Sequence, residues 1–343
     1  MTDFADLDRK SLIYALENKN NAYITTLLSK AGEVRNAHIG YKVHLRGLIE
    51  ISNVCRKDCL YCGIRRSNGK ASRFSMGREE IIGCARQAFE LGYGSVVIQS
   101  GERCDHQFTN EITETIREIK SIGNGALGIT LSLGEQSAEV YKEWFEAGAH
   151  RYLLRIEASN PELFRKIHPN DGLHAYERRI RALEDLKSAG FLTGTGIMIG
   201  LPFQTTSDIA DDLLFFKEFD APMIGMGPYI PHADTPLAAY ESMIPAAEDR
   251  LTLSLKTVAL LRLLMPDINI AATTALEALH PSGREMALRS GANILMPNIT
   301  PPENRARYTL YRSKERLSET APEGFEIGFN EWGDRRKAGA VRP

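Results

Sequence analysis

The 343-residue sequence contains no run of about eighteen or more apolar residues, so it predicts no membrane-spanning helix. Its first residues are acidic and polar, and they lack the basic stretch and apolar segment of a signal peptide. The charges nearly cancel, giving a formal net charge of -2, so no strong field would recruit nucleic acid or an anionic membrane. These absences predict a cytoplasmic protein that binds neither nucleic acid nor membrane.

Cysteine is also scarce. The chain has five cysteines, an odd number, and three of them lie between residues 55 and 62. This distribution is a poor framework for disulfides and a good one for a metal, because closely spaced thiols can share one centre. We therefore expect a reducing compartment and a metal site on this short segment.

The sequence shows no low-complexity segment and no clear linker, which favours one large domain. From about residue 43, short apolar or β-branched runs alternate with amphipathic stretches, a pattern typical of repeated βα units. We predict an α/β fold, a (βα)8 barrel of the TIM type, with its active site at the C-terminal ends of the strands. The predicted strands span residues 43–52, 95–100, 128–133, 151–157, 194–200, 223–230, 268–274 and 292–298.

The barrel is predicted to span residues 43–300, with additions at both ends. Residues 1–42 are expected to form a helical N-terminal extension, and residues 301–343 a C-terminal segment that partly closes the barrel. A helix capped by Ser75 is expected after the first strand, and its apolar stripe includes Cys84. Cys84 is therefore expected in the core.

The most specific motif is CRKDCLYC, directly after the first predicted strand. Cys55, Cys59 and Cys62 are spaced to occupy corners of an iron–sulfur cube, and soft thiolates favour such clusters. A closed electron-transfer cluster would need a fourth cysteine, but Cys84 belongs to a helix and Cys104 follows the second strand. One iron is therefore expected to lack a protein ligand. The alternative is a structural zinc site, which would need a fourth ligand that no nearby histidine supplies.

This CX3CX2C motif, with an aromatic residue before its last cysteine, resembles the radical S-adenosylmethionine (SAM) superfamily. The resemblance implies an enzyme in which these three cysteines bind a 4Fe-4S cluster. They would be both the metal ligands and the catalytic residues. It further implies that S-adenosyl-L-methionine binds the open iron and is cleaved to a 5′-deoxyadenosyl radical. An electron donor such as ferredoxin or flavodoxin is implied as a partner.

The end of the second strand carries Gln99, Ser100, Gly101 and Glu102. This segment is similar to the one that holds the methionine amino group of the cofactor in the superfamily. Gly101 would let the backbone approach the ligand closely, because it has no side chain. An ordinary turn at the end of a strand is the alternative.

Arg155 and Glu157 are two residues apart on a predicted strand, so they face the same side. Charged side chains at the end of a barrel strand destabilise the fold unless they form an ion pair or bind a ligand. Glu157 could accept hydrogen bonds from ribose or ammonium groups, and Arg179 could clamp a carboxylate. A structural ion pair is the alternative. Met198 would pack on adenine, with simple core packing as its alternative.

Longer stretches, among them RGLIEISNVCRKDCLYCGIRR, RYLLRIEASNP, MGPYIPHADTPLA and GANILMPNITP, resemble the HydE family of maturases for iron-iron hydrogenase. The resemblance runs from about residue 40 to about residue 312. This resemblance assigns Gln99, Ser100, Glu157, Arg179 and Met198 to the cofactor, and the other residues predicted to bind it are Tyr61, Gly101, Ser132 and Arg155. Those assigned to the substrate are Thr273, Thr274, Met296, Tyr308 and Tyr311. The paired threonine hydroxyls could bind a small anion or a polar head group.

The resemblance implies radical attack on an organometallic iron–cysteinate complex that bears carbon monoxide and cyanide. A partner maturase would supply this small molecule during assembly of the two-iron unit of the H-cluster. Some family members have three further cysteines for an auxiliary cluster, but none follows the eighth predicted strand here, so one cluster is expected. The alternatives are a small-molecule radical SAM mutase or sulfur-inserting enzyme, similar to methylornithine synthase or biotin synthase, and a non-catalytic iron–sulfur electron carrier.

Overall fold

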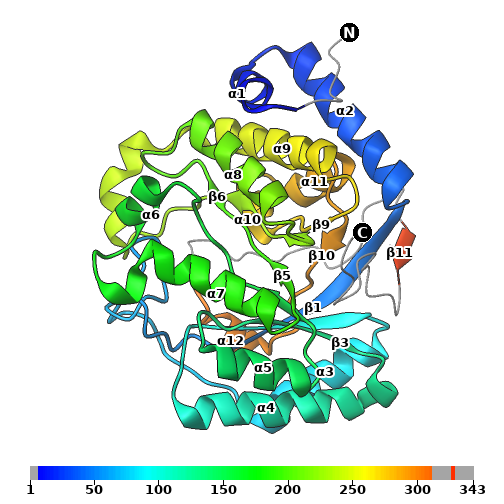
Figure 1. Cartoon of the computed structure of the whole chain (residues 1–343), viewed down its shortest axis with the longest axis vertical. Coiled ribbons are helices and arrows are strands. Elements are labelled where there is room, and N and C mark those ends of the chain that lie inside the picture. Colours follow the sequence, from blue (N-terminus) through cyan, green and yellow to red (C-terminus); the bar gives the residue numbers. More distant parts are fainter. Residues whose placement is uncertain (1–6, 311–325, 329–343) are drawn as a thin grey trace.

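The computed structural model describes residues 7–310 and 326–328. Two helices, α1 (Arg9–Glu17) and α2 (Asn21–His38), precede the first strand. The Asp8 carboxylate caps α1, since it accepts a hydrogen bond from the Ser11 N–H at 2.8 Å. In Figure 1 these helices lie at one end of the molecule, where α1 packs on α8 and α2 packs on α9.

The strands are short and their pairings are parallel. The longest, β1, carries β10 on one side and β2 on the other, and the sheet continues in the order β10-β1-β2-β3-β4-β5. The strands are β1 (Lys42–Ser52), β2 (Ser95–Ser100), β3 (Gly128–Ser132), β4 (Arg151–Leu153), β5 (Leu192–Gly194), β6 (Met198–Ile199), β7 (Met223–Ile224), β8 (Gly227–Pro228), β9 (Asn269–Ile270), β10 (Ile294–Leu295) and β11 (Glu326–Gly328).

Two isolated bridges close this sheet into a barrel. Thr195 pairs with Ile224 and thereby links β5 to β7, which pairs with β9. Ala271 pairs with Ile294 and links β9 to β10. The ring therefore passes through all eight predicted strand positions, and the predicted TIM-type fold class is confirmed.

The fifth and sixth predicted strands are each divided into two short pieces near the C-terminal end of the barrel. The outer pieces, β6 and β8, pair with each other apart from the main sheet. The division lies where Gly196 approaches Gly225 so closely that an added Cβ on Gly196 would lie 1.9 Å from the Gly225 carbonyl oxygen. Only glycine fits at this approach.

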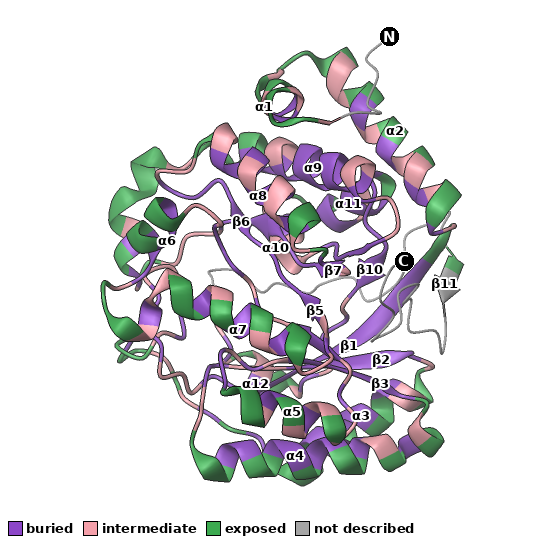
Figure 2. Ribbon diagram, in the orientation of Figure 1, coloured by how far each residue is buried: buried purple, intermediate pink, exposed green. Residues whose placement is uncertain are grey.

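Helices surround the barrel, and Figure 2 shows buried strands inside helices whose outer faces are exposed. None of the helices in the described ranges is long and apolar enough to cross a membrane. The remaining helices are α3 (Arg78–Glu90), α4 (His106–Ser121), α5 (Ala138–Glu146), α6 (Pro161–Ile167), α7 (Tyr176–Ser188), α8 (Thr206–Glu218), α9 (Ala247–Leu264), α10 (Thr274–Leu279), α11 (Gly283–Arg289) and α12 (Pro302–Arg305), with short 3-10 turns η1 (Ile122–Gly125), η2 (Gly172–His174) and η3 (Pro236–Met243).

The start of α3 differs from the sequence-based expectation. Its N-cap is Gly77, whose N–H donates to the Glu80 carboxylate at 2.8 Å. The Ser75 hydroxyl instead lies 2.8 Å from the hydroxyl of Ser52 at the end of β1. Cys84 is buried on the inner face of α3, as predicted. The division into residues 1–42, 43–300 and 301–343 stays a prediction, and most of the last segment lies outside the described residues.

Candidate functional site

The cysteine motif forms a loop that continues from β1 and is held by hydrogen bonds to its backbone. The buried Asn53 amide donates to the carbonyl oxygens of Ser72 and Arg307, both at 2.8 Å. Arg73 donates to the carbonyl oxygens of Asn53 at 2.6 Å and Ile64 at 2.7 Å. Both side chains therefore fix the path of the loop at its start and middle.

The three thiols of the loop are free of disulfides, and Cys59 is buried while Cys55 and Cys62 are half-buried. Burial raises the pKa of Cys59 to about 12 and also raises the pKa values of Cys55 and Cys62. A negative charge on Cys55 or Cys59 adds to the rise at Cys62, so the thiols are close enough to interact. Three thiolates packed together need a cationic centre, and soft sulfur donors fit iron–sulfur clusters.

Gly101, at the end of β2, packs directly against this loop. Its N–H donates to the Ser52 carbonyl at 2.9 Å. An added Cβ would lie 2.4 Å from the Val54 carbonyl oxygen and 2.8 Å from the Cys55 Cβ. The glycine therefore permits close packing against the cysteine loop, whereas the sequence suggested a close approach to a ligand.

The two polar residues before Gly101 make different contacts. The Gln99 amide donates to the Tyr308 hydroxyl at 3.3 Å. The Ser100 hydroxyl donates to the Gly101 carbonyl at 2.6 Å. Gln99 thus lies against Tyr308, so the structure brings a predicted cofactor residue and a predicted substrate residue into contact.

Arg155 and Glu157 form an ion pair, with 3.1 Å between Arg155 Nη2 and Glu157 Oε2. Glu157 has a φ of 65°, which is unusual for a residue with a side chain. Its backbone is held there by a 2.9 Å hydrogen bond from its N–H to the Gly196 carbonyl. Burial raises the pKa of Glu157, while the charge of Arg155 acts in the opposite direction. Such strained, buried charges are typical of functional sites.

Arg179 comes from α7 and is buried beside the cysteine loop. Its Nε donates to Glu135 Oε1 at 2.7 Å, and its Nη1 donates to the Arg155 carbonyl. Burial acts to lower the pKa of Arg179, but the Glu135 carboxylate outweighs this effect and the pKa is raised. Among the described residues no hydrogen-bond partner is found for Nη2, which leaves this nitrogen available to a further acceptor.

Glu135, in the loop that follows β3, is the centre of a charge network that sequence analysis missed. Besides Arg179, its carboxylate accepts hydrogen bonds from Lys57 at 2.9 Å and Arg178 at 2.8 Å. Burial acts to raise the pKa of Glu135, but Arg179 and Lys57 lower it to about 2. Lys57 lies between two of the motif cysteines, so the network reaches the loop itself.

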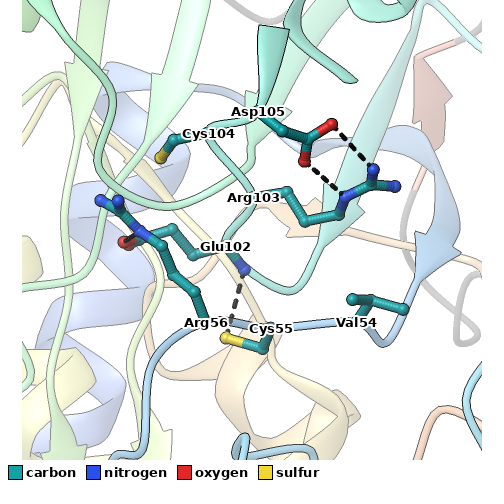
Figure 3. Close-up of a pocket in the computed structure, with 7 residues that line it drawn as sticks. All are labelled: Val54, Cys55, Arg56, Glu102, Arg103, Cys104 and Asp105. Carbon is teal, nitrogen blue, oxygen red and sulfur yellow. Dashed lines mark hydrogen bonds and ion pairs between the residues drawn. The ribbon is translucent and has the colours of Figure 1, made fainter. Parts of the chain in front are cut away.

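Glu102 adds a second carboxylate to this network. Its backbone N–H lies 3.3 Å from Cys55 Sγ, and its side chain accepts hydrogen bonds from Arg56 and from the Glu135 N–H, both at 2.8 Å. Figure 3 shows the contacts of Glu102 with Cys55 and Arg56 beside a surface pocket of about 740 Å³. The pocket is lined by Val54, Cys55, Arg56, Glu102, Arg103, Cys104 and Asp105.

Two buried histidines lie next to the loop and were also missed. His174 Nε2 accepts a hydrogen bond from the Asp58 N–H at 2.8 Å, while Nδ1 lies 2.7 Å from Asp171 Oδ1. The Tyr61 hydroxyl is 3.4 Å from His168 Nε2, and the two rings meet edge to face. Burial lowers the pKa of His168 to about 3, so this side chain is neutral.

Two further residues predicted to bind the cofactor occupy the strand ends. Ser132 ends β3, half-buried, and lies opposite Gln99 in the sheet register. Met198 is buried in an apolar cluster that includes Leu163 and Tyr229 and contacts Tyr61. Core packing, the alternative from sequence, is therefore at least part of the role of Met198.

The residues predicted to bind substrate come from neighbouring strand ends. Thr273 follows β9, and its hydroxyl donates to the Met226 carbonyl at 3.2 Å. Thr274 begins α10, and Met296 follows β10. Tyr308 is fully buried, with its ring edge-on to Phe74. Tyr311 lies outside the described residues.

The radical SAM superfamily model matches residues 49–216 of this chain. The FeFe hydrogenase maturase subunit HydE of Thermotoga maritima is 47% identical over 309 residues, which cover 90% of this chain and 85% of that protein. This chain belongs to the radical SAM superfamily and, within it, to the HydE family. It is therefore a radical SAM enzyme that uses a 4Fe-4S cluster and S-adenosyl-L-methionine, in place of the zinc protein or electron carrier considered from sequence.

More distant relatives share the fold. The 3-methylornithine synthase of Methanosarcina barkeri is 27% identical over 304 residues, covering 88% of this chain and 81% of that protein. The crystal structure of methylornithine synthase (PylB) matches with a TM-score of 0.75 at 23% identity, covering 91% of this chain and 89% of that one. These similarities support the barrel architecture.

Proposed function

We propose that this radical SAM enzyme is a hydrogenase maturase that acts on an iron–carbonyl–cyanide–cysteinate complex during assembly of the two-iron unit of the H-cluster. The 47% identity to HydE over 90% of the chain carries this proposal. Partner maturases would supply and receive the small molecules, and a ferredoxin or flavodoxin would supply the electron. The proposal gives the strand-end residues a common purpose, because they face one barrel mouth.

Cys55, Cys59 and Cys62 hold the cluster in this proposal. Their position on one loop, with Cys59 buried and Cys55 and Cys62 half-buried, supports the assignment, as does the Glu102 N–H directed at Cys55 Sγ. Backbone donors to cluster sulfurs are a recognised means of tuning such centres. When bound, the cluster supplies the electron that cleaves S-adenosyl-L-methionine.

The remaining cofactor residues bind and orient S-adenosyl-L-methionine. Arg179 presents Nη2 to the cofactor carboxylate while its other nitrogens are held by Glu135 and the Arg155 carbonyl. Glu157, fixed by Arg155, accepts hydrogen bonds from the ribose. The other proposed cofactor residues lie on the cysteine loop and at the ends of strands. They are Tyr61, Gln99, Ser100, Gly101, Ser132 and Met198.

Hydroxyl and thioether groups around β9 and β10 would receive the iron complex. Thr273, Thr274, Met296 and Tyr308 belong to this group, and Tyr311 keeps the same expected role. Hydroxyls can hydrogen-bond the ligands of low-valent iron without displacing them, because they are poorer ligands than thiolate or cyanide. A closed barrel interior also keeps water from the reacting groups.

The proposal is tested by hydrogenase maturation in vitro, with the partner maturases and a synthetic iron–carbonyl–cyanide–cysteinate complex. Wild type should yield active hydrogenase, and Cys59→Ala should yield almost none. Cys84→Ala is the matched control, since it removes a buried thiol of α3 outside the loop, and it should retain activity. Equal maturation by Cys59→Ala, or conversion of lysine to methylornithine by wild type, would contradict the proposal.

A further inference from the structure

The charge network around Glu135 connects the cysteine loop to three other elements. Glu135 follows β3 and binds Lys57 of the loop together with Arg178 and Arg179 of α7. Glu102 follows β2 and approaches Arg56 at 2.8 Å and Lys57 at 3.8 Å. The Glu135 N–H donates to the Glu102 carboxylate, so the two acidic residues are themselves joined.

This network carries more positive than negative charge. Its basic members are Arg56, Lys57, Arg178 and Arg179, and its acidic members are Glu102 and Glu135. Four positive charges against two negative charges leave an excess of two.

The members nearest the centre are shielded from water. The side chains of Lys57 and Glu102 are each 4% exposed, Glu135 is 2% exposed and Arg179 is 8% exposed. A buried charge is unfavourable unless an opposite charge lies nearby. Arg56 and Lys57 belong to the cysteine loop itself, and the Glu102 N–H lies 3.3 Å from Cys55 Sγ, so the excess positive charge lies beside the proposed cluster site.

We infer that this buried network, with Glu135 as its positioning residue, sets the reduction potential of the cluster on the cysteine loop. The inference rests on the proposed assignment of Cys55, Cys59 and Cys62 as cluster ligands. A cluster gains one negative charge when it accepts an electron from an external reductant, so nearby positive charge favours the reduced state. Glu135 holds Lys57 and Arg179 at fixed positions and also offsets part of their charge.

The inference predicts shifts of opposite sign from two charge-removing variants. Lys57→Met removes a positive charge and should lower the midpoint potential of the cluster. Glu135→Gln removes a negative charge and should raise it. A purely structural role would disturb the loop in both variants and would not give opposite signs.

The experiment is an anaerobic potentiometric titration of the reconstituted full-length protein, followed by the electron paramagnetic resonance signal of the reduced cluster. Lys57→Arg retains the charge and should restore a potential close to that of wild type. Glu143→Gln is the matched control for Glu135. Glu143 lies on α5, where its carboxylate accepts a hydrogen bond from Thr113 at 3.0 Å, and its loss should leave the potential unchanged.

Iron content separates a failed inference from a failed assignment. If wild type loads no cluster, or the triple cysteine-to-alanine variant loads one, the proposed cluster site is wrong. If the clusters load and the two shifts are absent or have the same sign, the network does not set the potential. Should the buried variants fail to fold, Arg56→Gln replaces them because that side chain is 35% exposed. It must lower the potential, and an unchanged value would overturn the inference.

Discussion

Gly101 occupies a position with no room for a side chain, between the end of β2 and the cysteine loop. We predict that Gly101→Ala will push the loop away, because its Cβ would meet the Val54 carbonyl oxygen at 2.4 Å and the Cys55 Cβ at 2.8 Å. Forcing an extra methyl group into packed structure typically costs about 1–3 kcal/mol. Iron bound per chain after anaerobic reconstitution should therefore fall, together with the urea midpoint.

Gly83→Ala provides the control for this prediction. Gly83 lies within α3, and an added Cβ there would meet nothing within 4 Å. Alanine favours a helix over glycine by up to about 1 kcal/mol, so this variant should load iron normally and unfold at slightly higher urea. Normal iron loading by Gly101→Ala would mean that the loop tolerates the displacement.

The residues that were predictable from sequence are those with a local signature. The spacing of Cys55, Cys59 and Cys62 within one loop is such a signature. Lys57 and Glu135 are different, because their contact joins positions far apart in the chain and neither residue is unusual in its own segment. The sequence signal that could have revealed the charge network was the presence of basic residues between the cysteines and of acidic residues after the second and third strands.

Among the elements, the strands near the barrel mouth depart most from the sequence pattern. The apolar run at 151–157 predicts one continuous strand, but β4 ends at Leu153. Beyond it the Ile156 N–H donates to the Thr195 hydroxyl at 3.0 Å, and Glu157 adopts a positive φ. The Thr195 hydroxyl thus takes the place of the backbone carbonyl that would accept this hydrogen bond in a regular sheet. The hydrophobic periodicity of the sequence cannot reveal this change of hydrogen-bond acceptor.

The N-terminal helix α1 ends against a buried lysine of α9. Lys256 donates to the carbonyl oxygens of Ala15 at 3.1 Å and Asn18 at 3.0 Å, and also to that of Leu16. We predict that Lys256→Met will leave these carbonyls without their donor. The expected cost is about 1–3 kcal/mol per group that stays buried and unpaired. Hydrogen exchange across α1 should become faster.

Lys142→Met tests whether loss of any lysine has this effect. Lys142 lies on α5 with its side chain 71% exposed and its amine 3.9 Å from Glu146. Exposed pairs of this kind contribute little, so exchange in α1 should match wild type. Unchanged exchange in Lys256→Met would show that α1 is held mainly by its packing on α8 and α9.

At the scale of the whole molecule, the eight βα units were visible in the sequence because each strand is a compact apolar run. The closure of the ring was not visible, since it depends on two single-residue bridges, at Thr195 and Ala271. The same holds for charge. The formal net charge of -2 describes the whole chain. The charge network around Glu135 has an excess of positive charge, and its members come together only in the folded structure.

Two buried groups give the stability of the molecule opposite dependences on pH. Burial lowers the pKa of His168 from 6.5 to about 3. Its contribution to the free energy of unfolding is therefore fully present above pH 6.5, its pKa in the unfolded chain, and is lost as pH falls toward 3. Burial raises the pKa of Asp212 from 3.8 to about 7. Its contribution to the free energy of unfolding is therefore fully present below pH 3.8 and is lost as pH rises through 7. The difference between wild type and a variant isolates one group.

His168→Asn should remove the acid-dependent loss. The asparagine amide can replace the hydrogen bond between His168 Nδ1 and the Phe164 carbonyl, which spans 2.9 Å, without binding a proton. One pKa unit corresponds to about 1.36 kcal/mol, so between about pH 7.5 and about pH 5 wild type should lose about 2 kcal/mol of unfolding free energy relative to the variant. Anaerobic urea unfolding at several pH values measures this difference, to which Asp212 contributes equally in both proteins. A difference that stays constant across the range would mean that His168 is protonated as readily in the folded chain as in the unfolded one.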